Sequence, residues 1–218
     1  MNLEVISNAL PFLIEGAWVT LKVSILAIVI GTILGFILCL FKMSHNPILK
    51  TFSSIYIWLF RGLPLLIILF LAYYATPFNI TLTAFVAALF AMSLNAAAYK
   101  AEIIRSGMMA IPKGQIEAAE AIGMTPVQIM FRIKIPQMVR LIIPPYINNA
   151  VVLLKESAQI SVITVPDLML NAQMQYSSTY LPYETLGVAA ILYLVLTSGL
   201  MLLQSYTEKK LNVSNNNL

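Results

Sequence analysis

Polar and charged side chains interrupt the long apolar stretches of this sequence at a few positions. Arg61 stands well inside one stretch, and Lys155-Glu156 ends another. Asn95 and Tyr99 lie four residues apart, which places them on one face of a helix. An unpaired Arg in hydrocarbon costs about 2.5–3.5 kcal/mol, so such groups should face the protein interior or water. Their chemistry would be either noncovalent handling of a polar solute along a path or hydrogen bonding between helices.

Residue types for covalent chemistry are scarce. The phosphate-binding pattern G-x-x-x-x-G-K-[ST] does not occur in the sequence. His45 is the only histidine and lies among loop residues, and Cys39 is the only cysteine and lies in an apolar stretch. A zinc site, a Ser/His/Asp set and an internal disulfide are therefore not expected. We predict no catalytic residue and no cofactor bound by this chain. If the chain moves a solute uphill, the energy must come from a partner.

The composition indicates an integral membrane protein. Hydrophobic residues make up 60% of the chain and charged residues only 10%. Gly31 and Gly35 stand four apart in the first apolar stretch, a spacing that lets a neighbouring helix approach closely, although Gly is common in membrane helices generally. We expect an all-α fold with about five transmembrane helices, near residues 19–41, 52–74, 82–99, 137–154 and 186–201.

Several segments differ from a simple apolar helix. Residues 1–12 mix apolar and polar types and are expected to form a short interfacial segment. Pro64 removes a backbone donor and should kink the second span. Pro144-Pro145 and Asn148-Asn149 make the fourth span a poor lipid-facing helix, so it should be walled in by other helices or line a polar path. Pro166-Asp167 should begin a short helix.

The distribution of basic residues predicts the orientation in the membrane. With five spans, one side holds Lys42, Lys50, Lys100, Arg105, Lys113, Arg132, Lys134, Arg140, Lys209 and Lys210. The segments on the other side hold Glu4, Glu15, Asp167 and Glu184, and only Lys22 and Lys155 come near it. The positive-inside rule then places the N-terminus outside and the C-terminus in the cytoplasm. Because membrane insertion accounts for the net charge of +4, no nucleic-acid partner is expected.

A polar stretch at residues 112–136 lies between the third and fourth spans on the predicted cytoplasmic side. Pro112 fits the first position of a short helix that Gly123 would end. Thr125 and Pro126 fit the start of a second short helix. An Ala-rich face followed by Gly lets another protein approach the backbone closely, which indicates a docking element. A passive amphipathic helix on the membrane surface is the alternative.

Glu117-Ala118-Ala119, Gly123 and Ile133-Lys134-Ile135-Pro136 resemble the EAA loop of ATP-binding-cassette importer permeases, with Ile135 where the family usually has Leu. Three flanking segments, residues 61–66, 93–102 and 154–157, are similar to the polar-amino-acid branch of that family. That branch commonly has K-D-[ST]-S-L where this chain has Lys155 to Gln159. The departure leaves the amino acid carried open.

The resemblance implies a type I importer fold in one permease domain, residues 1–218, with a coupling loop at about 106–136. It implies a multi-pass protein of the bacterial cytoplasmic membrane that pairs with a second copy or a similar permease. A cytoplasmic ATPase, which binds the ATP and Mg²⁺, would dock on Glu117, Ala118, Ala119 and Gly123. An extracytoplasmic solute-binding protein would touch the outer loops. The substrate path is predicted to involve Arg61, Asn95, Tyr99, Glu156 and Ser157.

Two other functions fit the residues alone. A self-sufficient channel or secondary transporter could use Arg61, Lys155 and Glu156 for gating or proton relay, although no internal repeat supports an inverted-repeat carrier. A membrane scaffold could recruit an ATPase without transporting anything. Solute movement without an ATPase would distinguish the channel or carrier from a permease.

Overall fold

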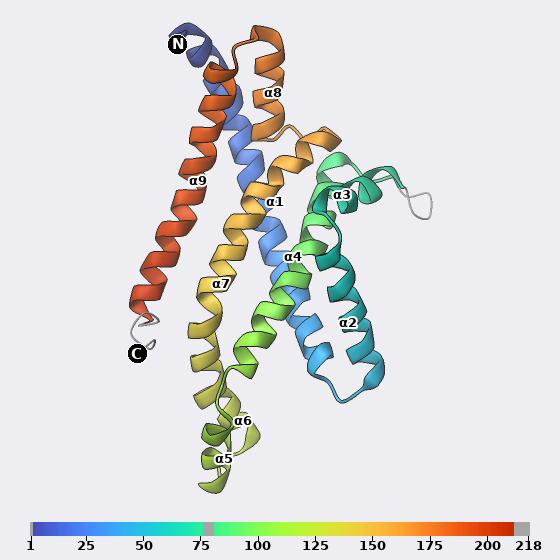
Figure 1. Cartoon of the computed structure of the whole chain (residues 1–218), viewed down its shortest axis with the longest axis vertical. Coiled ribbons are helices and arrows are strands. Elements are labelled where there is room, and N and C mark those ends of the chain that lie inside the picture. The colour runs from blue at the N-terminus through green and yellow to red at the C-terminus, as the bar shows by residue number, and fades with distance from the viewer. Residues whose placement is uncertain (1, 76–80, 212–218) are drawn as a thin grey trace.

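The structure is a computed structural model that describes residues 2–75 and 81–211. Within those ranges every regular element is helical (Figure 1). The α-helices are α1 (Leu3–Met43), α2 (Pro47–Gly62), α3 (Leu65–Tyr74), α4 (Ala84–Met109), α5 (Lys113–Ala121), α6 (Pro126–Ile129), α7 (Ile135–Glu156), α8 (Leu168–Thr179) and α9 (Pro182–Lys210). A π-helical turn, η2 (Met130–Lys134), joins α6 to α7, and a 3₁₀ turn, η3 (Ser157–Ile163), follows α7.

Four helical segments of the described chain are long and apolar enough to cross a membrane: α1, α4, α9 and the continuous run Pro126–Ile163. The bent pair α2 and α3 provides the fifth candidate. The two helices meet at 103° across Leu63 and Pro64. With 16 and 10 residues, neither helix reaches the roughly 20 residues that a crossing needs. The predicted kink at Pro64 is thus a complete break, and the all-helical fold with about five spans is confirmed.

Two predicted boundaries are wrong. Residues 1–12 are not a separate interfacial segment, because α1 begins at Leu3 and continues unbroken past Pro11. The Asn2 side chain accepts hydrogen bonds from the first turn of that helix and so fixes its start. The third span ends at Met109 rather than near residue 99, so Lys100 and Arg105 lie within α4 and not in a loop. The sequence also predicts an uncharged turn at residues 76–79 and a polar tail at residues 212–218, and both segments lie outside the described residues.

The central contact of the bundle is the crossing of α1 and α4. A Cβ atom on Gly31 would lie 2.6 Å from the Ala96 Cβ, and one on Gly35 would lie 2.9 Å from the Ala97 carbonyl oxygen. The two glycines therefore serve the close approach of α4, as their spacing suggested. Around them, Ala97 and Ala101 are fully buried, so the interface is built from small side chains.

A buried lysine joins α4 to α7 beside this crossing. The Lys100 side chain is fully buried, and its Nζ lies 3.8 Å from the centroid of the Tyr146 ring and 3.5 Å from Asn149 Oδ1. The Tyr146 hydroxyl in turn lies 2.6 Å from the Thr32 hydroxyl of α1. A cation on an aromatic face is attracted by the ring quadrupole, and this attraction strengthens when water is excluded. Three helices are thus linked by one polar chain.

At the opposite end of the bundle from α5, the start of α8 is fixed by Asp167. Its carboxylate accepts a hydrogen bond from the Leu170 backbone N–H at 2.9 Å and one from the Tyr193 hydroxyl of α9 at 3.5 Å. The Leu168 N–H donates to the Thr20 hydroxyl of α1 at 3.1 Å. Asp167 is fully buried, and burial raises its pKa from 3.8 to about 6, although the hydrogen bonds oppose this rise.

The glycine contact predicts a stability difference. Gly31→Val should lower the stability of the protein by about 1–3 kcal/mol, because the added carbons overlap Ala96 and its backbone. Gly199→Val in α9 is the matched control, since a Cβ there meets nothing within 4 Å. Thermal unfolding in detergent measures both. Equal losses in the two variants would show that the α1–α4 crossing does not limit stability.

A second prediction concerns pH. The folded protein holds the Asp167 proton to a higher pH than the unfolded chain, so this group makes stability fall as pH rises from about 4 to about 6, by up to about 3 kcal/mol. Asp167→Asn keeps a side-chain oxygen for the helix cap but has no titrating group. Unfolding midpoints measured from pH 4 to 8 should lose this component in the variant. An unchanged pH slope would assign it to other groups.

Candidate functional site

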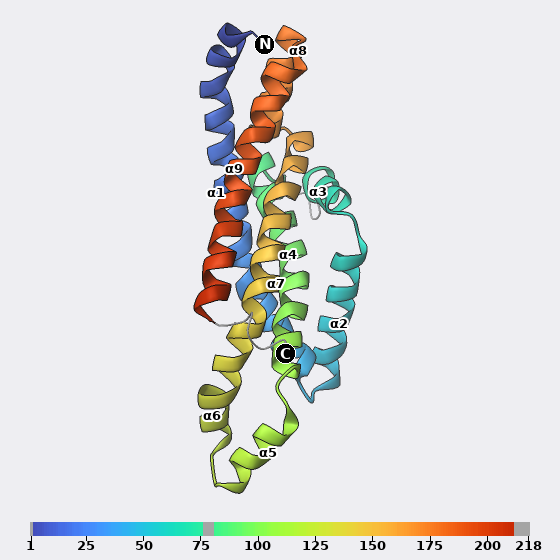
Figure 2. The ribbon, with the colours of Figure 1, turned by 60° about the vertical axis from the view of Figure 1, so that its left-hand side comes forward.

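The predicted docking loop projects from one end of the bundle. Figure 2 shows α5 and α6 beyond the end of the bundle, at the opposite end from α8. A hydrogen bond of 2.6 Å between the Gln137 and Gln115 side chains ties α5 to the start of α7. The α5 helix begins at Lys113, one residue later than predicted, with Pro112 at the N-cap position.

The end of α5 is set by Gly123. This residue has φ of +81°, the left-handed conformation that glycine adopts without a Cβ penalty. The Gly123 N–H donates to the Glu120 carbonyl at 2.9 Å, and the Met124 N–H donates to the Ala119 carbonyl at 3.0 Å. This pair of bonds is the Schellman pattern, which completes the carbonyl groups of the last turn. The predicted helix stop at Gly123 is confirmed.

The second short helix begins as its sequence predicted and continues much further. The Thr125 hydroxyl accepts from the Gln128 N–H at 3.3 Å, and the Gln128 side chain accepts from the Thr125 N–H at 2.9 Å. This reciprocal capping box starts α6 with Pro126 at its first position. The helix then passes through η2 into α7 and η3, so that residues Pro126–Ile163 form one continuous run of 38 residues.

A hollow of about 450 Å³ lies between α5 and the start of this run. Ala118, Ala119 and Ile122 line its α5 side, and Arg132 and Ile133 line the other. Ala119 is buried, whereas Glu117, Ala118 and Gly123 are exposed. Apolar side chains near the hollow are unusually open to solvent: Ile122 is 79% exposed, Val127 65% and Phe131 66%. Exposed apolar groups outside the apolar spans indicate a surface that another protein covers.

The predicted path residues fall into two groups. Arg61 and Tyr99 lie together, since the guanidinium carbon of Arg61 is 5.4 Å from the centroid of the Tyr99 ring. They line a cavity of about 420 Å³ between α1, α2 and α4, which Trp58 and Glu102 also line. The structure therefore brings two of the five predicted path residues, Arg61 of α2 and Tyr99 of α4, to one polar cavity.

The other three predicted path residues lie apart from that cavity. Asn95 is nearly fully buried, and its Oδ1 has no hydrogen-bond partner among the described residues. Glu156 is half-buried at the end of α7, beside an exposed Lys155. Ser157 is fully buried and donates to the Leu154 carbonyl at 2.7 Å, which gives it a local structural bond. Their part in a substrate path stays a prediction.

Sequence reasoning missed an ion network at the lower edge of the same cavity. Glu102 Oε1 lies 2.6 Å from Lys42 Nζ, and Glu102 Oε2 lies 2.7 Å from Arg105 Nη2. Glu102 and Arg105 are three apart on one helix, a spacing that allows pairing, but the 60 residues between Lys42 and Glu102 gave no local signal. Among the described residues, no group of three His, Cys, Asp or Glu side chains is placed to hold a metal ion.

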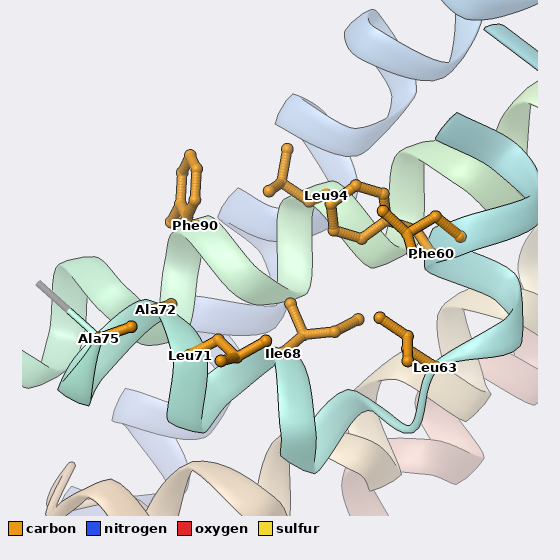
Figure 3. A pocket seen from close by; sticks show the side chains of 9 residues that line it. Phe60, Leu63, Ile68, Leu71, Ala72, Ala75, Phe90 and Leu94 are labelled. Atoms are coloured by element: carbon orange, nitrogen blue, oxygen red, sulfur yellow. The ribbon is translucent and has the colours of Figure 1, made fainter. Parts of the chain in front are cut away.

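A second cavity, of about 340 Å³, lies in the bend between α2 and α3 and against α4. Figure 3 shows its side chains, which include Phe60, Ile68, Leu71, Phe90 and Leu94. All nine lining residues are apolar, so this cavity offers no hydrogen bond or charge to a polar solute. The polar cavity beside Arg61 is therefore the better candidate for contact with a polar solute.

These features are those of an all-helical membrane protein with a polar cavity within its bundle and a loop that projects from one end. The sequence profile of the "Binding-protein-dependent transport system inner membrane component" family matches residues 9–213. The chain belongs to that family, which places it in a bacterial inner membrane as a multi-pass protein.

Individual relatives agree over almost the full length. The chain is 40% identical over 210 residues to a Rickettsia bellii protein named as a glutamine transport system permease protein, GlnP, covering 95% of this chain and 96% of that one. It is 38% identical over 215 residues to the arginine transport system permease protein ArtQ of Bacillus subtilis, covering 97% and 98%.

Solved structures share the fold. A crystal structure of an amino acid ABC transporter with histidines matches with a TM-score of 0.90 and 38% identity, over 96% of this chain and 99% of that one. The methionine transporter MetNI in an inward-facing form matches with a TM-score of 0.75 at 21% identity, over 93% and 97%, which supports the fold alone. The predicted type I importer fold is confirmed.

The geometry of Gly123 predicts separable effects on folding and docking. A Cβ at Gly123 meets nothing within 4 Å, so the side chain of Gly123→Trp would extend toward a docked partner. Within the chain itself, the substitution should cost only backbone strain of about 1–2 kcal/mol. The variant should insert and fold but bind its ATPase at least tenfold more weakly. Gly114→Trp, also in open space on α5, is the bulk control. Co-purification with the ATPase measures both, and full binding by Gly123→Trp would refute the docking role.

Proposed function

We propose that this chain is the membrane-spanning permease subunit of an ATP-driven importer for polar amino acids. The observation that carries this proposal is the exposed end of α5, which includes Ala118 and Gly123. It comes directly before the long helix Pro126–Ile163, which continues into the membrane. The family membership and the amino-acid transport names of relatives at about 40% identity support the substrate class.

The proposed partners follow from the surfaces of the molecule. A cytoplasmic ATPase would cover the hollow of α5 and the apolar side chains beside it, with Glu117, Ala118, Ala119 and Gly123 as contacts. An extracytoplasmic solute-binding protein would contact the opposite end, where α8 lies. In this orientation the N-terminus is outside and the C-terminus is cytoplasmic, as the basic residues predict.

A second permease subunit would cover one face of α7. Pro145, Asn148 and Lys155 are exposed along that helix at intervals of three and seven residues, about one and two helical turns, which places them on one face. Polar groups on a lipid-facing side are costly, so this face should border another subunit or a water-filled path. The partner would be a second copy of this chain or a similar permease, with the substrate path between the two subunits.

Motion would pass from the docking loop to the path through a continuous helix. The run Pro126–Ile163 has no break between the loop and η3, and the Gln115–Gln137 bond makes α5 move with it. ATP binding would draw the two ATPase subunits together and displace the two loops. The spans would then alternate between inward-open and outward-open arrangements.

The alternative of a self-sufficient channel or secondary transporter is tested by reconstitution. The purified chain alone in vesicles should not accumulate L-glutamine or L-arginine, because in this proposal the energy for transport comes from the ATPase partner. Addition of the cognate ATPase and binding protein should give ATP-dependent uptake of at least one polar amino acid. The mass of the intact complex should correspond to two permease subunits. Uptake by the chain alone would refute the proposal.

A further inference from the structure

The cavity between α1, α2 and α4 contains a cation whose charge is not balanced by a neighbour. Arg61 lies on the ring of Tyr99, and no carboxylate of the described residues is within ion-pair distance of its guanidinium. Arg presents five N–H donors in a planar fork that matches a carboxylate in a bidentate manner. The cavity therefore holds an unused recognition group for an anion.

The remaining charges of the cavity add to this preference. Glu102 is the only acidic residue in its lining, and Lys42 and Arg105 neutralise that carboxylate from both sides. The lining therefore holds two cations, Lys42 and Arg61, and one anion, and a third cation, Arg105, is paired with that anion from outside the lining. An ammonium group would be repelled by this set, whereas a carboxylate would be attracted.

The form of the cavity suits one small molecule. Its volume of about 420 Å³ falls in the ~300–1,000 Å³ range of small-molecule sites. Ile57 and Trp58 add apolar surface to the lining, and Ser54 adds a hydroxyl group. The lining thus combines one strong anion-binding group with neutral surface that tolerates different side chains.

The cavity lies on the face of α4 that carries two of the predicted path residues, Asn95 and Tyr99. Residues Ala96, Ala97 and Lys100 face the glycines of α1, whereas Tyr99 and Glu102 line the cavity from a different face of the helix. Asn95 precedes Tyr99 by one turn on that face. The α4 helix runs toward α5 (Figure 1), and Glu102 comes after Asn95 in that helix. The cavity therefore lies nearer than Asn95 to the docking-loop end of α4.

We propose that this cavity is a carboxylate-binding station in the cytoplasmic half of the path, where Arg61 receives the α-carboxylate of the amino acid on its way out of the permease. The inference rests on the proposed function and adds a subsite to it. The α-carboxylate is common to all amino acid substrates, so the station binds them without selecting among side chains. Tyr99 keeps the guanidinium in place between transport events through the cation–π contact.

Trp58 provides a direct reporter of occupancy. The chain has two Trp residues, so Trp18→Phe leaves Trp58, which lines the cavity, as the only indole. In the detergent-purified full chain, L-arginine and L-glutamine should change the Trp58 emission saturably. Agmatine and 4-aminobutanamide, which are the same molecules without the α-carboxylate, should not. Arg61→Gln in this background should abolish the response.

Transport by the complete complex gives an independent readout. Arg61→Gln should lower the maximal uptake rate about tenfold, the loss expected for one charge-assisted hydrogen bond. The Michaelis constant should not change, because capture occurs at the outer binding protein. Arg61→Lys should retain part of the rate. Lys22→Gln is the matched control: Lys22 also lies on an aromatic ring, 5.5 Å from the Phe85 centroid, but outside the cavity, and its loss should leave uptake unchanged.

The outcomes separate this inference from the proposed function. If the wild-type complex imports amino acids but Arg61→Gln transports at the full rate, the station is refuted and the permease function stands. An equal Trp58 response to agmatine and arginine refutes carboxylate recognition. A response only to vesicles of anionic phosphatidylglycerol assigns the cavity to a lipid headgroup and also refutes the inference. If Arg61→Gln does not fold, the Trp58 titration and Arg61→Lys decide the matter.

Discussion

The close crossing of α1 and α4 is the contact on which the other helices depend. Helices in a bilayer gain no hydrophobic stabilisation by associating, so their packing relies on close van der Waals contact and hydrogen bonds. Gly31 and Gly35 allow α4 to lie against the α1 backbone, with no room for a side chain. The same approach buries the stem of Lys100 against Gly35 and directs its ammonium group to Tyr146. The position of α7 therefore follows from two glycines in another helix.

Charged groups lie on the side of α4 that borders the polar cavity, and their charges are balanced to different degrees. Glu102 is paired with two cations from α1 and α4, so it adds no uncompensated charge. Among the described residues, Arg61 is stabilised by the quadrupole of Tyr99 and by no carboxylate, which would give a stronger stabilisation. The apolar cavity in the bend of α2 and α3 lies nearby but has no such group. An unequal distribution of this kind is typical of a site where a visiting group completes the charge balance.

The sequence predicted best what depends on local chemistry. The turn at Gly123 and the cap at Thr125 follow from residues within a few positions, and both formed as expected. Apolar composition was sufficient to find the spans but not their ends. The α4 helix continues past Tyr99 because Lys100 and Glu102 find partners on α1 and α7, which are distant in sequence. The bend of 103° at Pro64 is likewise larger than the predicted kink, because its size depends on how α3 packs against α4.

The continuous helix Pro126–Ile163 links the proposed docking surface, outside the apolar bundle, to groups within the bundle. A break between α6 and α7 would let the loop move alone, but η2 keeps the helix hydrogen-bonded through a π-helical turn. At its far end the run packs against α3 through η3, and in its middle it carries Tyr146 and Asn149 against Lys100. Because Tyr146 and Asn149 of α7 contact Lys100 of α4, we infer that a displacement of α7 is passed on to α4. Since α4 carries Tyr99, on whose ring Arg61 lies, such a displacement would change the shape of the polar cavity.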